Sequence, residues 1–211
     1  IRGMTDSNLT EDTVYEIGKA FSTQMQKSGI RQVVTGRDGR ISSPIIEKSL
    51  SRGLQDGGSI VTSIGRVATP MLYYATEKLK TGTGIMVTGS HNPPNYNGLK
   101  MMMDGTTLSG SSIQEIYHTI NDGASRKGSG SGSGSGSELS ITSEYLNEII
   151  DQVKLKKSLS VVVDCGNGVA GDFAPKLLRE VGANVEELYC DVDGSFPNHH
   201  PDPAEPLNLQ D

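Results

Sequence analysis

The stretch Thr88-Gly89-Ser90-His91-Asn92-Pro93-Pro94-Asn95-Tyr96-Asn97-Gly98-Leu99-Lys100 constrains the fold more than any other part of the chain. An apolar run, Gly84-Ile85-Met86-Val87, leads into it, and a second apolar run begins at Leu99. The two prolines and the Asn97-Gly98 pair predict a stiff turn, although the same residues also form ordinary surface turns. Ser90 therefore stands at the end of a buried strand, where a prepositioned hydroxyl suits group transfer.

Strands and helices alternate on both sides of this stretch. Strands are expected at 32–35, 59–63, 84–88 and 99–103, and helices from a cap at Asn8 or Thr10 to 28, then at 43–56, 69–79 and 111–121. This order predicts an α/β fold: a three-layer α/β/α domain with a mixed, mostly parallel sheet, followed by part of a second similar domain. Functional loops gather at strand ends in such sheets, where the Gly36 turn, Gly65 and Ser90 are expected.

A strict Gly-Ser alternation from Gly128 through Ser137 predicts a flexible tether. So regular a repeat favours an engineered linker over a natural low-complexity loop. It divides the chain into a first domain at 1–127, the linker at 128–137 and a second part at 138–211. Helices at 143–154 and 172–181 and strands at 160–164 and 184–189 are expected in this second part, which has too few elements for a complete domain.

Length and charge exclude several classes of protein. The chain has 211 residues, of which 34% are hydrophobic, and a net charge of −6 without a basic patch. Binding to nucleic acid or to an anionic membrane is therefore not expected. No apolar run approaches the roughly 20 residues of a membrane span. The chain begins at Ile1-Arg2-Gly3 without a methionine, so we expect a piece of a longer protein.

Several segments resemble the α-D-phosphohexomutases, in particular the bacterial phosphomannomutase/phosphoglucomutases. The stretch at 88–100 resembles the phosphoserine loop of that family, and Gly36-Arg37-Asp38-Gly39-Arg40 resembles its early glycine-arginine turn. Ile1-Arg2-Gly3 resembles the end of its N-terminal active-site motif. The segments 161–168 and 193–201 resemble the start of its second domain.

The resemblance implies a reaction and roles for four residues. Ser90 would carry a phosphoryl group, donate it to a mannose or glucose monophosphate, and take the other phosphoryl group back from the bisphosphate intermediate. Arg2 and Lys100 match positions that bind the phosphoryl group, with Lys100 also a proton acceptor or donor. His91 matches a residue close to the phosphoserine. The implied cofactors are Mg²⁺, contacted by the phosphate on Ser90, and a hexose 1,6-bisphosphate activator.

From the residues alone, each role has an alternative. Arg2 is equally a frayed terminal charge, Lys100 a solvent-facing strand residue, and His91 a residue that holds the loop in shape. Ser90 does not stand in a Gly-x-Ser-x-Gly motif, so a serine hydrolase is poorly supported.

The aspartate-rich loop that holds Mg²⁺ in the family, Asp-Gly-Asp-x-Asp-Arg, does not occur in this sequence. The family's later domains, which recognise the sugar, are missing too, and one phosphoserine oxygen does not hold a hard cation tightly. We therefore expect a mutase as the parent protein but little turnover by this chain alone. The alternative is a non-catalytic folded domain or binding module with an idle serine loop.

Other charged and polar groups have structural interpretations. We expect Arg37, Asp38 and Arg40 to brace neighbouring loops by ion pairs rather than to bind substrate. Gly166-Asn167-Gly168 precedes a helix, where it is either an anion cradle or, more simply, a tight strand-to-helix connection.

Acidic and histidine residues gather in the segment 191–202, but their spacing fits no standard zinc pattern and the prolines favour an ordered loop. Cys165 and Cys190 are interpreted as reduced thiols, which suits a cytoplasmic protein.

Overall fold

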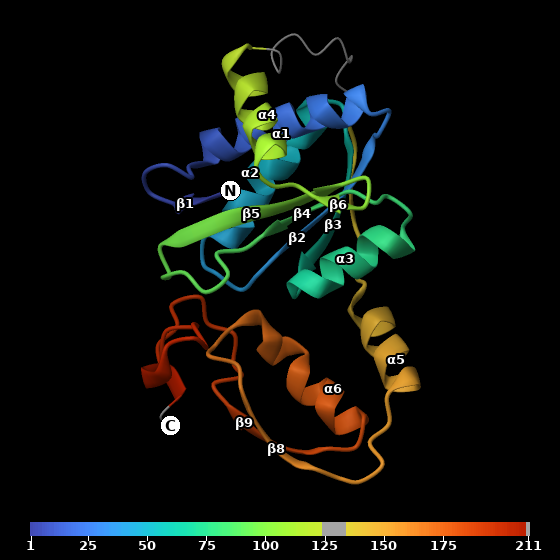
Figure 1. Cartoon of the computed structure of the whole chain (residues 1–211), viewed down its shortest axis with the longest axis vertical. Coiled ribbons are helices and arrows are strands. Elements are labelled where there is room, and N and C mark those ends of the chain that lie inside the picture. The colour runs from blue at the N-terminus through green and yellow to red at the C-terminus, as the bar shows by residue number, and fades with distance from the viewer. Residues whose placement is uncertain (124–133, 210–211) are drawn as a thin grey trace.

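The computed structural model describes residues 1–123 and 134–209, and Figure 1 shows them as two units. Within the described residues, the first unit holds a seven-stranded sheet in the order β1-β5-β4-β2-β3-β7, with β6 paired to β5. The strands are β1 (Arg2–Met4), β2 (Gln32–Arg37), β3 (Ile60–Arg66), β4 (Gly84–Val87), β5 (Tyr96–Met103), β6 (Thr106–Thr107) and β7 (Gly136–Glu138). The helices are α1 (Glu11–Lys27), α2 (Ser43–Asp56), α3 (Thr69–Lys78) and α4 (Ser111–Asn121).

The sheet is mixed. Its centre is parallel, because β2 pairs in parallel with both β3 and β4, and β3 pairs in parallel with β7. The side that carries the serine loop is antiparallel, where β5 pairs with both β4 and β1. The antiparallel return places the end of β4 and the start of β5 side by side, with the serine loop between them.

Two apolar clusters cover the two faces of this sheet and make the three layers. Helices α1, α2 and α4 supply one cluster, which receives Val33 of β2. Helix α3 lies against the opposite face, whose cluster receives the next residue, Val34. Successive side chains of a strand point to opposite faces, so β2 is apolar on both sides and lies at the centre of the core.

The second unit contains the parallel pair β8 (Ser160–Asp164) and β9 (Asn184–Leu188) with helices α5 (Thr142–Gln152) and α6 (Ala174–Glu180). Its described residues also form the short 3₁₀ helices η2 (Val169–Asp172) and η3 (Pro206–Leu209). Its residues Leu146 and Phe173 join the α3 cluster of the first unit. Ion pairs reinforce this contact, with Lys78 2.7 Å from Glu148 and Arg66 2.8 Å from Asp172. The two units therefore share a core.

Several expectations differ from the structure. Asn97 and Gly98 are not turn residues: both lie in β5 and pair with β1, a strand that was not expected. Gly98 permits this pairing because a Cβ there would lie 2.6 Å from the Ile1 carbonyl oxygen. Gly36 also lies in a strand, where a Cβ would meet Val67 at 2.9 Å, so packing rather than a turn requires glycine.

The Gly-Ser segment lies partly outside the described residues. Its last residues, Gly136 and Ser137, are not a free tether but begin β7 at the edge of the sheet, in register with Val61 and Thr62. Backbone pairing needs no apolar side chain, which is why composition did not predict this strand. No helix in the described ranges is long and apolar enough to cross a membrane.

Candidate active site

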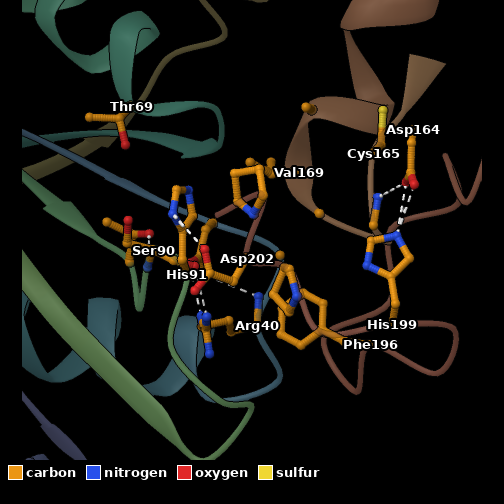
Figure 2. A pocket seen from close by; sticks show the side chains of 18 of the residues that line it. Arg40, Thr69, Ser90, His91, Asp164, Cys165, Val169, Phe196, His199 and Asp202 are labelled. Atoms are coloured by element: carbon orange, nitrogen blue, oxygen red, sulfur yellow. Dashed lines mark hydrogen bonds and ion pairs between the residues drawn. The ribbon is translucent and has the colours of Figure 1, made fainter. Parts of the chain in front are cut away.

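A cavity of about 510 Å³ opens between the two units (Figure 2). The first unit contributes Ser90, His91 and Lys100, and the second contributes Asp164, His199 and Asp202. The serine loop thus faces the end of β8 and the loop that follows β9 across a shared space. A hollow of this size between two units is a usual place for a small-molecule site.

Ser90 adopts a left-handed backbone conformation, with φ at 53°. Its amide donates to Thr88 Oγ1 at 2.9 Å, and its carbonyl accepts from Arg40 Nη2 at 2.9 Å. A non-glycine residue in this region is strained unless its surroundings hold it there. The loop therefore presents the Ser90 side chain to the cavity from a fixed, unfavourable backbone.

Arg40 holds the serine loop through hydrogen bonds to its backbone. Its side chain is only 1% exposed and its guanidinium donates to four carbonyl oxygens of the loop. The four acceptors are Ser90 and Asn92, at 2.9 and 2.6 Å from Nη2, and Pro93 and Tyr96, at 2.6 and 3.1 Å from Nη1. Burial lowers the pKa of Arg40 and Asp38 opposes that shift; arginine stays protonated in proteins.

Asp38 completes this support. Its Oδ2 lies 3.4 Å from Arg40 Nε and accepts from the Gly89 amide at 3.2 Å, and its Oδ1 accepts from Ser43 Oγ at 2.5 Å. Gly89 packs so closely on the guanidinium that a Cβ there would overlap Arg40 Nε and Cζ. The expected bracing of a loop is confirmed for Asp38 and Arg40, whereas Arg37 pairs with Glu47 of helix α2 at 3.1 Å.

The other predicted site residues lie around the same loop. Lys100 is an exposed residue of β5 that lines the cavity, in register with Met86. His91 lines it too, with Nδ1 4.0 Å from Asp202. Arg2 pairs with Gly98, two residues from Lys100, so both cations lie on one face of the antiparallel ribbon. Arg2 is not among the residues that line the cavity.

Three backbone amides of the second unit beside the cavity already donate hydrogen bonds within that unit. The Gly166 amide donates to Asp164, the Asn167 amide to Tyr189 and the Gly168 amide to Cys165. These amides are not free for an anion, so the tight-connection interpretation of Gly166-Asn167-Gly168 is correct and the anion cradle is wrong. Asp164 also receives His199 Nε2 at 2.9 Å.

The two cysteines lie next to each other beside the cavity. Both are free thiols, and their sulfur atoms are 3.3 Å apart. Burial, followed by the hydrogen bond with Cys190, raises the pKa of Cys165 to about 12. Cys165 is therefore a protonated, unreactive thiol at neutral pH.

The described residues do not make a Mg²⁺ site. No group of three or more His, Cys, Asp or Glu side chains in the described ranges is arranged to hold a metal ion. Asp38, whose Oδ2 accepts from the Gly89 amide of the serine loop, is engaged by Arg40 and Ser43 as well. The acidic segment 191–202 consists of turns and bends, with no helix or strand among these described residues.

Sequence reasoning gave no role to several residues of the cavity. Thr69, Phe196 and Asp202 line it, although Phe196 and Asp202 had been noted only as members of longer segments and Thr69 only as the start of a helix. Phe196 lies over the Arg40 guanidinium, with its ring centroid 5.0 Å from Cζ (Figure 2). The one sequence feature that could have drawn attention to Phe196 is its place as an aromatic residue between glycine and proline in a polar loop.

Comparisons with known proteins agree with this architecture. Residues 1–127 match the family model for phosphoglucomutase/phosphomannomutase alpha/beta/alpha domain I, and residues 143–211 match domain II. A phosphoglucomutase of Neisseria meningitidis serogroup B is 48% identical over 212 residues, covering 100% of this chain and 45% of that protein. A phosphomannomutase/phosphoglucomutase of Pseudomonas aeruginosa PAO1 is 46% identical, with 45% of its length covered.

A crystal structure of a phosphoglucomutase/phosphomannomutase family protein from Burkholderia thailandensis has a TM-score of 0.92 and 40% identity, covering 100% of this chain and 47% of that one. The chain thus spans about half the length of the relatives it matches. With both family models matched in order along the sequence, the chain belongs to the phosphoglucomutase/phosphomannomutase family.

Proposed function

We propose that the parent protein interconverts hexose 1-phosphates and hexose 6-phosphates of the mannose and glucose type through a phosphoserine at Ser90. The observation that carries the proposal is the geometry of the loop. Ser90 is held at φ 53° by a buried arginine and faces a cavity of about 510 Å³. A carrier group fixed in this way loses little freedom when a sugar phosphate binds.

In the proposed transfer, the bond between Ser90 Oγ and phosphorus breaks as a sugar hydroxyl oxygen bonds to phosphorus. The proton of that hydroxyl ends on the serine oxygen, and we assign its movement to Lys100. The bisphosphate then reorients and returns its other phosphoryl group to Ser90. The cations Lys100 and Arg2 compensate charge on the transferring group, and His91 contacts it from the loop.

Binding of a metal ion would require ligands from the parent protein. The described residues offer no three-ligand cluster, so the phosphate on Ser90 would supply one ligand and the remaining ligands would come from elsewhere in the parent. A bound Mg²⁺ neutralises phosphate charge.

We propose accordingly that this chain alone has little or no turnover and depends on the later domains of the parent. Free Cys165 and Cys190 support a cytoplasmic location for that parent. A folded, non-catalytic module with an idle serine loop is the competing function, because the same loop geometry would persist without chemistry.

Mass spectrometry separates the two functions. The chain is incubated with glucose 1,6-bisphosphate, digested and mapped, with Ser90→Ala as the matched control. Phosphate on the peptide containing Ser90, and its loss from the control, supports the carrier role. In the parent, Ser90→Ala should abolish conversion of glucose 1-phosphate. Full mutase activity in that variant would refute the proposal.

A further inference from the structure

We propose that Phe196, a residue of the second unit, is a positioning residue for the serine loop of the first unit and acts through Arg40. The inference concerns the conformation of the loop. Its catalytic consequence rests on the proposed function of Ser90, but the contacts themselves do not.

The Arg40 guanidinium needs a favourable contact on its face, because it is buried and not all of its nitrogen atoms are hydrogen-bonded. Nη1 and Nη2 each donate to two of the four loop carbonyls, but Nε has no hydrogen-bond partner among the described residues and lies 3.4 Å from Asp38 Oδ2. The Phe196 ring lies over this group, with its centroid 5.0 Å from Cζ. A ring face in this position attracts the cation and keeps water from the carbonyls that the guanidinium binds.

Phe196 is itself held in place at a backbone cost. Its φ is 53°, a left-handed conformation that is unusual for a bulky residue. A tight turn maintains it: the Phe196 amide donates to the Asp193 carbonyl at 3.0 Å, and Asp193 Oδ1 accepts from Ser195 N at 2.9 Å and from Ser195 Oγ at 2.7 Å. Strain retained in this way marks a position that the surrounding structure over-determines.

Two glycines allow the loops to meet at this point. A Cβ on Gly194 would lie 2.5 Å from the Ile41 amide nitrogen and 2.8 Å from Arg40 Cα. A Cβ on Gly39 would overlap the side chain of Val192. The turn that carries Phe196 is therefore pressed, backbone against backbone, on the segment that carries Arg40.

These contacts form a chain of support from the second unit to the carrier serine. The Asp193–Phe196 turn covers Arg40, Arg40 holds the carbonyl of Ser90, and that carbonyl belongs to the strained residue. Removing the ring should loosen the serine loop without disturbing the sheet, because Ser90, Asn92 and Pro93 lie between β4 and β5 and their carbonyls are bound by Arg40.

Hydrogen–deuterium exchange on the 211-residue chain tests this inference. In Phe196→Leu, the amides of Gly89, Asn92 and Tyr96 should exchange about tenfold faster than in the unchanged chain. Phe196→Tyr keeps the ring and should restore the slow exchange. Tyr117→Leu, which alters an exposed ring on α4, is the matched control and should leave the loop unchanged.

A second variant approaches the same contact from the backbone. Gly194→Ala should separate the two loops and speed exchange at the same amides, with circular dichroism reporting whether each variant is folded. If Phe196→Leu loses its fold, Phe196→Met keeps the volume without the ring and takes its place. Unchanged exchange of the loop in folded Phe196→Leu or Phe196→Met, or equal loosening of the whole sheet, would overturn the inference.

The parent protein adds a readout that a merely structural role would not change. Phe196→Leu should lower kcat about tenfold with little change in KM, and Phe196→Tyr should recover kcat. If the loop loosens but Ser90 never takes up phosphate, the proposed function fails and the positioning role stands. If Ser90 is phosphorylated normally while its loop is indifferent to Phe196, the positioning role fails alone.

Discussion

The serine loop and the Asp193–Phe196 turn hold the same backbone strain by different means. Ser90 and Phe196 each have φ at 53°. Ser90 is held locally by Thr88 and also by Arg40 from a distant part of the sequence, whereas Phe196 is held by the hydrogen bond from its amide to the Asp193 carbonyl, three residues before it. A conformation held by contacts from distant residues is lost when any one of those residues is substituted. A turn held by hydrogen bonds between neighbouring residues tolerates most substitutions in other parts of the chain.

The two regions also differ in how far their conformation depends on the rest of the molecule. The serine loop depends on the packed first unit and on the turn of the second, so its geometry is defined only in the assembled fold. The second-unit turn is built largely from its own residues and from Asn167, whose carbonyl accepts from the Asp193 amide at 3.0 Å. Substitutions in the two regions should therefore differ in both size and reach.

The largest effect is expected from Arg40→Met. This change strands four carbonyl oxygens and the Asp38 carboxylate in a buried place, and should lower the free energy of unfolding by about 3–5 kcal/mol. Urea denaturation followed by circular dichroism measures it. Arg52→Met, at an exposed arginine of α2, is the control and should cost less than about 0.5 kcal/mol. Equal losses from the two variants would break the comparison.

Asp38→Asn should have the next largest effect, about 2–3 kcal/mol, because an amide does not balance the buried guanidinium. The Asp38 side chain is 11% exposed and receives Arg40, Ser43 and Gly89. Thermal unfolding combined with hydrogen exchange of the loop would detect both the global and the local change. A variant as stable as the original chain would show that the loop does not need this carboxylate.

Local and long-range supports differ in how well the sequence predicts them. Amphipathic spacing and capping residues predicted the helices well. For example, α1 begins after Thr10, whose Oγ1 accepts from the Thr13 amide at 3.3 Å and so caps the helix. The α/β class and the position of Ser90 were also predictable, because strand, turn and helix signals are local. The expected bracing by Arg37, Asp38 and Arg40 followed from charge alone.

What sequence reasoning missed depends on residues that are far apart in the chain. The antiparallel pairing of β1 with β5 turned the expected Asn97-Gly98 turn into a strand, and β7 adds an edge that composition disfavoured. The role of Phe196 requires knowing that it meets Arg40 across the two units. None of these contacts leaves a periodicity or a local motif.

Asn167→Gly sharpens the local side of the comparison. Glycine keeps the left-handed conformation at φ 56° but loses the hydrogen bonds of the side chain to the Asp191 carbonyl and to Asn198. We expect a loss of about 1–2 kcal/mol. Faster exchange should appear in 189–200 and, to a smaller extent, in the serine loop that the Asp193–Phe196 turn supports. Loosening of both regions to the same extent would show that they form a single unit.

The ionisation of Cys165 should have the smallest effect on stability at neutral pH. Burial raises its pKa to about 12, so the thiol stays protonated well above the pH at which an unfolded cysteine ionises. Since folding favours the neutral form, this contribution to stability is complete below the unfolded pKa and is lost as the pH rises through the folded one. In Cys190→Ala, which leaves Cys165 as the remaining thiol, iodoacetamide at pH 8 should react at least tenfold more slowly with the folded than with the urea-unfolded chain. Labelling at the unfolded rate would mean that the ends of β8 and β9 open readily, and the second unit would then lack the local rigidity on which its turn depends.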